Sequence, residues 1–125
     1  MTQEEKDLLL KDLCARLTYG VKVRYSSYDR FITCTLHSIN PVYSIVDLWS
    51  KDACFNPVII DKIKPYLFPL SSMTEEQKKE EYEICKYYLN GYESKLIDFY
   101  HKNHFDYRGL IKKGLALDAT GLNIY

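Results

Sequence analysis

The sequence lacks an excess of charge of either sign, because 17 lysines and arginines balance 17 aspartates and glutamates in 125 residues. A balanced chain has no overall field that draws it onto nucleic acid, so we do not expect nucleic acid as a partner unless charges gather locally. The sequence also lacks an apolar run of membrane-spanning length, and its first residues are acidic where a signal peptide needs basic ones. These absences predict a cytoplasmic protein that does not act at a membrane.

The four cysteines lack the C-x-x-C spacing that is typical of zinc and redox sites. They are widely separated and have apolar neighbours. We therefore expect four reduced, buried thiols that hold no metal, and no cofactor. The cysteines are Cys14, Cys34, Cys54 and Cys85.

What the sequence does contain, at 46% hydrophobic and 27% charged residues, is the composition of a single compact domain covering residues 1–125. Thr2 and Glu5 form a capping-box pattern, and Leu9, Leu10 and Leu13 follow at helical spacing. The sequence thus predicts an N-terminal helix that ends near residue 20.

The pattern then changes to an alternation of apolar and polar residues, which is typical of strands. Apolar positions alternate over 21–25 and 32–36, and the runs "VYSIVDLW" and "PVIID" follow. We expect a β-rich front half, to about residue 62, that forms a small antiparallel sheet of three or four strands. An open sheet and a barrel-like sheet both fit this pattern.

A helical tail is predicted over 72–114. Pro65 and Pro69 cannot donate to a strand ladder, so the residues between them are expected to form an extended linker on the core. Two overlapping capping boxes, Ser72 with Glu75 and Thr74 with Gln77, are alternative starts for a helix. That helix is expected to bury Tyr82, Cys85 and Leu89 and to end at "NG", Asn90 and Gly91.

A last long helix is expected over about 94–102, with Leu96, Ile97 and Tyr100 buried. The end, "GLALDATGLNIY", is consistent with a short closing strand or an extended tail. The fold class predicted from these elements is α+β, with an N-terminal helix, the small sheet and two or three C-terminal helices.

The stretch "HKNHFDYRGLIKKG", residues 101–114, admits three interpretations. As a metal site it offers His101, His104 and Asp106 beside Asp98, but nothing resembles an H-E-x-x-H arrangement. As a helix junction, it has His101 as a solvated cation at a helix end and His104 packed against Phe105. Asp106 then caps a short helix that a left-handed Gly114 ends, and Arg108 pairs with an acid.

As a ligand site, the same stretch offers a stacking ring, a bidentate arginine, lysines and a glycine where backbone can approach an anion. The stretch is interpreted first as a structural junction between helices, and a ligand-binding role in addition is a hypothesis. The candidate ligand-binding residues are His104, Asp106, Tyr107, Arg108, Gly109, Lys112 and Lys113.

Catalysis is not expected. No cysteine lies in the cationic surroundings that activate a thiolate, and the paired carboxylates fall on predicted solvent faces. No set of acid, base and nucleophile stands out, so we expect a protein that is not an enzyme.

Two segments carry a resemblance. "IKPYLFPLSSMTEEQ", residues 63–77, and "HFDYRGLIKKGLALDATG", residues 104–121, resemble segments of small uncharacterised proteins of phages, prophages and mobile elements of gut bacteria. The resemblance covers about the second half of the chain. Phe68 stands where those relatives have a basic residue, and Leu70 where they have methionine. The resemblance implies a mobile-element origin and no particular activity.

Together these observations predict a non-enzymatic phage or mobile-element protein that binds and sequesters a small nucleotide-like molecule of the host, with a possible anti-defence role. The abundance of tyrosine, 12 residues, suits either a ligand pocket or an interface. The alternative is an adaptor or inhibitor that binds a host protein. The residues do not indicate the oligomeric state, and a homo-oligomer is compatible with them.

Overall fold

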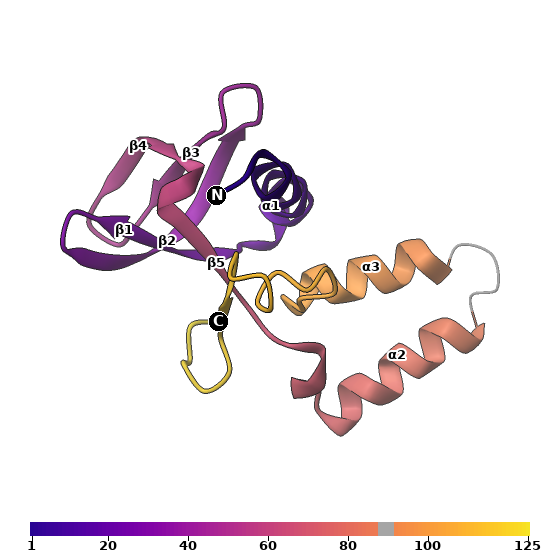
Figure 1. Ribbon diagram of the computed structural model, residues 1–125. Helices are drawn as coiled ribbons and strands as arrows, with labels where there is room; N and C mark the ends of the chain where they lie inside the picture. Colours follow the sequence, from indigo (N-terminus) through magenta and orange to yellow (C-terminus); the bar gives the residue numbers. More distant parts are fainter. Residues whose placement is uncertain (88–91) are drawn as a thin grey trace.

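The computed structural model describes residues 1–87 and 92–125 and has an α+β architecture (Figure 1). Helix α1 (Gln3–Arg16) packs on a sheet, and helices α2 (Glu75–Tyr87) and α3 (Tyr92–Lys102) form a hairpin that extends away from it. The strands are β1 (Lys22–Ser27), β2 (Arg30–Asn40), β3 (Ile45–Trp49), β4 (Cys54–Ile59), β5 (Ile63–Leu67) and β6 (Leu117–Asp118).

The sheet is open and mixed, with the strand order β4-β3-β2-β1-β5-β6. All pairings are antiparallel except that of β5 with β6. In a flat sheet β4 and β5 would lie about 19 Å apart. The chain from Ile59 to Ile63, which includes the short helix η2 (Ile60–Lys62), spans at most about 14 Å. The sheet must therefore curl. The curl brings Tyr25 on β1 close to Phe55 on β4, and the centroids of their rings are 5.0 Å apart.

Helix α1 fills the concave inner face of the sheet. The predicted capping box forms, since Thr2 Oγ1 accepts from the Glu5 amide and Glu5 accepts from the Thr2 amide. The helix continues into η1 (Leu17–Tyr19) and the chain turns at Gly20, whose φ is 70°, as expected. The main core joins leucines of α1, the inner-face residues of β1 to β3 and part of the C-terminal segment: Leu9, Leu13, Val23, Leu36, Leu48, Leu110 and Leu115.

The helical hairpin has a smaller core of its own, in which Met73, Phe99 and Phe105 are buried. Tyr100 on α3 donates a hydrogen bond of 2.7 Å to the Glu81 carboxylate on α2, which ties the two helices together. Of the two alternative capping boxes, Thr74 with Gln77 forms. A short helix, η3 (Leu70–Ser72), precedes it.

The expectation of three or four strands is too low, because strand β5 runs through Pro65 into the predicted linker, and β6 adds a sixth strand. Pro65 is tolerated because it lies at the end of the β1–β5 register, opposite Val23. The pairing of β5 with β6 begins only at the next residue, Tyr66. The closing strand, one of two alternatives for the C-terminal stretch, is β6.

The buried face predicted for α2 is wrong. Tyr82 is 64% exposed and Cys85 is exposed, while Glu81 and Ile84 are partly buried. The helix is rotated because Glu81 faces Tyr100 and Ile84 packs on the Phe99 cluster. Leu89, Asn90 and Gly91, which the sequence assigned to this face and to the end of the helix, lie outside the described residues.

The cysteines are also placed differently from the expectation. All four are free thiols, but only Cys34, on the inner face of β2, is buried. Cys14, Cys54 and Cys85 are exposed, because leucines and not cysteines fill the contact surface of α1, and β4 is an edge strand. Within the described residues no helix is long and apolar enough to cross a membrane.

The segment predicted as a short third helix, 106–114, is a series of turns, but its predicted end is correct. Gly114 has a φ of 75°. The Leu115 amide donates to the Leu110 carbonyl, and the Gly114 amide donates to the Ile111 carbonyl, which is the hydrogen-bond pattern of a Schellman motif. The two leucines that flank this motif are both buried in the main core.

We expect Gly114→Ala to lower the free energy of unfolding by about 1 kcal/mol. A Cβ at this position meets no atom within 4 Å, so the cost is the left-handed backbone alone. Urea denaturation of the variant beside Lys112→Ala, an exposed neighbour, measures it. An unchanged midpoint for Gly114→Ala would show that the turn does not depend on glycine.

Candidate functional site

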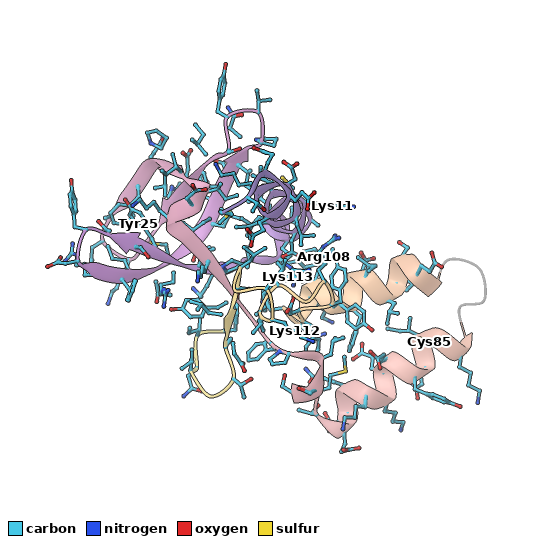
Figure 2. The ribbon with its side chains drawn as sticks, viewed as in Figure 1. Lys11, Tyr25, Cys85, Arg108, Lys112 and Lys113 are labelled. Carbon is cyan, nitrogen blue, oxygen red and sulfur yellow. The ribbon has the colours of Figure 1, made fainter. Side chains whose placement is uncertain are left out.

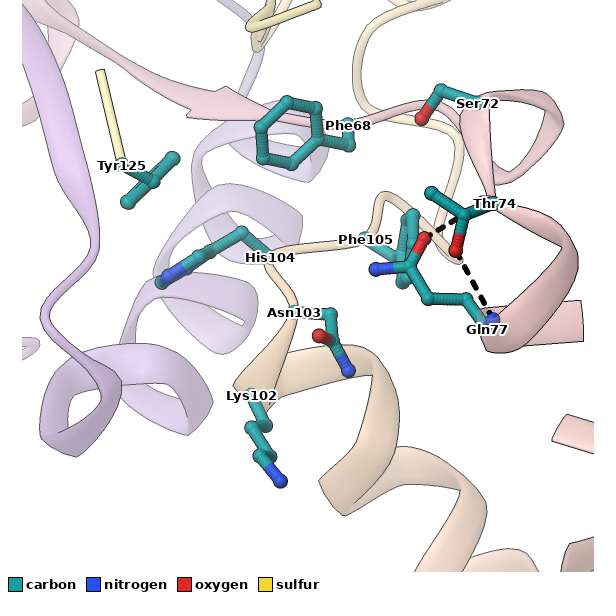
Figure 3. A pocket seen from close by; sticks show the side chains of 9 residues that line it. All are labelled: Phe68, Ser72, Thr74, Gln77, Lys102, Asn103, His104, Phe105 and Tyr125. Atoms are coloured by element: carbon teal, nitrogen blue, oxygen red, sulfur yellow. Dashed lines mark hydrogen bonds between the residues drawn. The ribbon is translucent and has the colours of Figure 1, made fainter. Parts of the chain in front are cut away.

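A cavity of about 470 Å³ lies where the helical hairpin meets the sheet (Figure 3). Its walls come from the end of β5, the start of α2, the end of α3 and the C-terminus of the chain. These segments are far apart in the sequence and meet only in the folded protein. The lining residues are Phe68, Ser72, Thr74, Gln77, Lys102, Asn103, His104, Phe105 and Tyr125.

Backbone hydrogen bonds hold two walls of the cavity together. The Phe68 amide donates to the His104 carbonyl, and the Asp106 amide donates to the Phe68 carbonyl, both at 2.8 Å. The chain after α3 therefore continues the pairing of β5 as an isolated parallel bridge between Phe68 and Phe105. This pairing fixes where His104 and Phe105 enter the cavity.

His104 and Tyr125 form one aromatic wall. Their ring centroids are 3.7 Å apart with an interplanar angle of 13°. The Tyr125 hydroxyl donates to the Tyr66 carbonyl at 2.7 Å and accepts from the Lys22 amide at 2.9 Å. Burial raises the pKa of Tyr125 to about 12. Burial, with the nearby cations Arg16 and Lys22, lowers the pKa of His104 to about 4, so this ring is neutral near pH 7.

The sequence-based expectation that His104 packs against Phe105 is therefore replaced by the stack on Tyr125. The reason is the positive φ of His104, 59°, which turns its side chain toward the C-terminus of the chain (Figure 3).

Two polar atoms of the lining side chains have no protein partner among the described residues, and a third, on His104, is buried. The Gln77 carbonyl is used in the capping box, which leaves its Nε2 as a donor. The Asn103 Nδ2 donates to the Phe99 carbonyl, which leaves its Oδ1 as an acceptor. His104 Nδ1 is buried without a hydrogen bond. Lys102 lies at the rim (Figure 3).

Beside this cavity, a buried ionic cluster joins α1 to the C-terminal segment. Asp12 and Arg16 are both 0% exposed, and the Arg16 Nε donates to one Asp12 oxygen at 2.8 Å. The Arg108 Nε donates to the other Asp12 oxygen at 3.0 Å. Arg16 Nη2 also donates to the Phe105 carbonyl, whereas its Nη1 is buried without a partner among the described residues.

Aromatic rings complete the cluster. The guanidinium carbons of Arg16 and Arg108 lie 5.4 Å and 4.9 Å from the centre of the Tyr107 ring. The Tyr107 hydroxyl is 2.7 Å from His101 Nε2. His101 is 5% exposed, so its predicted role as a solvated helix-end cation is wrong. Burial first, and then the charges of Arg16 and Arg108, lower the pKa of His101.

The remaining candidates from the sequence do not converge. The Asp106 carboxylate accepts from the amides of Leu110 and Ile111, so it occupies the anion position of its own turn. Gly109, with a φ of 75°, supplies the turn. Lys112 and Lys113 are exposed on the turns that follow (Figure 2), and Lys113 borders a separate hollow of about 290 Å³. Among the seven candidates, only His104 lines the larger cavity.

The described residues do not form the group of ligands that the metal-site interpretation requires. Within the described ranges 1–87 and 92–125, no three His, Cys, Asp or Glu side chains are placed to hold an ion. Among those weighed for it, His101 faces Tyr107, His104 faces Tyr125 and Asp106 faces backbone amides.

Sequence reasoning missed most of the cavity. Phe68 was expected in the linker between Pro65 and Pro69 and was noted for replacing a basic residue of the proteins that the chain resembles, but neither observation indicated a site. Asn103 and Lys102 lie inside the stretch 101–114 but were not among the candidate residues. Tyr125 is 21 residues beyond His104, and no local pattern links the two.

No protein-family profile, curated protein or solved structure matches this chain.

We expect Asp12→Ala to lower the free energy of unfolding by about 3 kcal/mol or more, because it leaves Arg16 buried without a counter-charge. Arg108→Ala should lower the free energy of unfolding by about 2 kcal/mol, because the Arg108 side chain is 20% exposed and Asp12 keeps its ion pair with Arg16. Chemical denaturation measures both, with Asp7→Ala, an exposed acid on the same helix, as the control. Equal effects of Asp12→Ala and Asp7→Ala would contradict the assignment.

Proposed function

We propose that this protein is a non-enzymatic binding protein whose cavity at Phe68, His104 and Tyr125 takes a small nucleotide-like molecule. The observation that carries the proposal is the combination of aromatic walls with an unpaired donor and acceptor in one cavity. Its volume, about 470 Å³, is within the usual range for sites that bind small molecules.

The aromatic walls suit a planar base. Phe68 and Phe105 meet edge to face with centroids 6.5 Å apart, and the stacked pair of His104 and Tyr125 stands beside them. A base that stacks on a protein ring gains about 1 to 3 kcal/mol, and every base has a face that can stack. Because His104 is neutral, its ring adds no positive charge beneath the base.

The polar atoms suit the edge of a base and its phosphate. Gln77 Nε2 is a donor and Asn103 Oδ1 an acceptor, and a nucleobase edge presents the complementary pair of groups. Lys102 at the rim favours a negative charge there. The phosphate contact is thereby moved from Arg108, whose Nε is bound to Asp12, to Lys102.

Binding without turnover fits this set of side chains. Among the described residues that line the cavity there is no carboxylate and no thiol, and the one imidazole is neutral and stacked. A nucleophile paired with a base, which covalent catalysis needs, is not among them.

The resemblance to proteins of phages and mobile elements supports a biological role for this binding. A small protein made inside a bacterial cell can act by withdrawing a host signal molecule from its receptor, which is the anti-defence role we propose. The competing proposal, an adaptor that covers a host protein, has no need of the cavity.

Isothermal titration calorimetry against cyclic and linear nucleotides tests the proposal. We expect at least one to bind with a Kd in the micromolar range or below. Phe68→Leu, which keeps an apolar side chain but loses the ring, should weaken binding about tenfold or more. Lys102→Ala should weaken binding of nucleotides and leave nucleosides unaffected, while Lys112→Ala should change neither.

Two results would contradict the proposal. One is the absence of any binding tighter than millimolar. The other is parent-like binding by Phe68→Leu and Lys102→Ala together with loss of binding in Arg108→Ala, which would place the ligand at the turn originally indicated by the sequence.

A further inference from the structure

The outer face of the sheet carries a second concentration of aromatic and basic side chains, separate from the cavity. Along each strand, residues alternate between the core and this face. Val23, Cys34 and Leu48 are buried in the core, so the residues beside them point outward. The side chains that define the outer face are Lys22 and Arg24 on β1, Phe31, Thr35 and His37 on β2, Asp47 and Trp49 on β3, and Lys64 on β5.

Two aromatic side chains on this face are exposed to solvent. Phe31 is 65% exposed and Trp49 is 50% exposed. The Trp49 ring is stacked on His37, with centroids 3.7 Å apart and an interplanar angle of 14°, which fixes the position of the ring. Trp49 pairs with Thr35, four residues along β2 from Phe31, so the two rings are separate platforms about 13 Å apart along that strand.

Cations lie beside both platforms. The Arg24 guanidinium lies 4.0 Å from the centre of the Phe31 ring, and its Nε is buried without a partner among the described residues. The Lys22 Nζ is 3.3 Å from Thr35 Oγ1, next to the Trp49 platform. In the β1–β5 register Arg24 stands directly opposite Lys64.

This placement of like charges is unfavourable for the isolated protein. Two cations directly opposite on neighbouring strands destabilise a sheet. None of the ion pairs recorded within the described residues involves Lys22, Arg24 or Lys64. The acid on this face, Asp47, accepts a hydrogen bond from Ser38 instead. The face is therefore complementary to an anionic partner.

We propose that the outer face binds a single strand of nucleic acid, with bases stacked on Phe31 and Trp49 and phosphates held by Lys22, Arg24 and Lys64. A single strand offers exposed base faces and regularly spaced phosphates, which match alternating rings and cations. A protein partner fits less well, because the centres of protein interfaces are depleted of charge. The balanced net charge of the sequence gives no indication of this face, because Arg24 and Lys64 are brought together only by the pairing of β1 with β5.

Trp49 is the only tryptophan in the chain, so its fluorescence reports directly on stacking at this face. We expect oligothymidylate and oligouridylate to quench it at low salt, with fluorescence anisotropy of labelled strands giving the Kd. Three neutralised phosphates predict a slope of about −2 for log K against log salt. A duplex of equal length should bind more weakly, because its base faces are covered.

Substitutions of single residues distinguish the contribution of ring stacking to binding from that of positive charge. Phe31→Ala and Trp49→Ala should each weaken binding about tenfold without changing the salt slope. Arg24→Gln should weaken binding and reduce the slope by about 0.7. The matched controls on α2, Tyr82→Ala for an exposed ring and Lys79→Ala for an exposed cation, should bind like the parent, as should the cavity variant Phe68→Leu.

Three outcomes would overturn this inference. The first is no binding of either strand at low salt. The second is binding that the duplex matches and that Phe31→Ala and Trp49→Ala leave unchanged, which would indicate general attraction to phosphate. The third is self-association of the parent that Trp49→Ala abolishes while no strand binds, which would assign the face to a second copy of the chain.

Discussion

The two oxygens of Asp12 each receive a guanidinium from a different part of the chain, and the placement of the C-terminal half depends on this arrangement. Arg16 comes from the same helix, and Arg108 lies 96 residues further along. A buried ion pair adds little net stability, but removing one partner is costly, so it selects one packing over its alternatives. Here it selects how residues 104–115 lie on α1.

The cavity follows from that packing. Arg16 also donates to the Phe105 carbonyl, next to the backbone pairing of Phe68 with His104 and Asp106. The same segment thus contacts α1 on one side and β5 on the other, and the hairpin of α2 and α3 extends away from the sheet beside it (Figure 1). The aromatic walls, which the proposed ligand would contact, are positioned by residues that never reach it.

The local sequence patterns correctly predicted those features of the fold that depend on neighbouring residues. The capping box at Thr2, the alternation of the first two strands and the left-handed Gly114 are set by neighbouring residues, and each was predicted. The features that the sequence did not predict depend on contacts between residues far apart in the chain. Strand β5 contains a proline that is tolerated only at its place in the register, and Asp12 looks like an ordinary solvent-facing acid until Arg108 is placed beside it. The cavity combines residues from four segments, so the sequence indicated only His104 among its walls.

The most direct test of the central role of Asp12 is amide hydrogen exchange, measured by NMR on the parent and on Asp12→Asn. The amides of Leu110, Ile111 and Leu115 report on the C-terminal segment, and that of Leu36, bonded to the Val21 carbonyl, reports on the sheet. If Asp12 holds this segment, the first three lose protection in the variant while Leu36 keeps most of its own. Equal loss at all four sites, or no loss at any, would contradict the account.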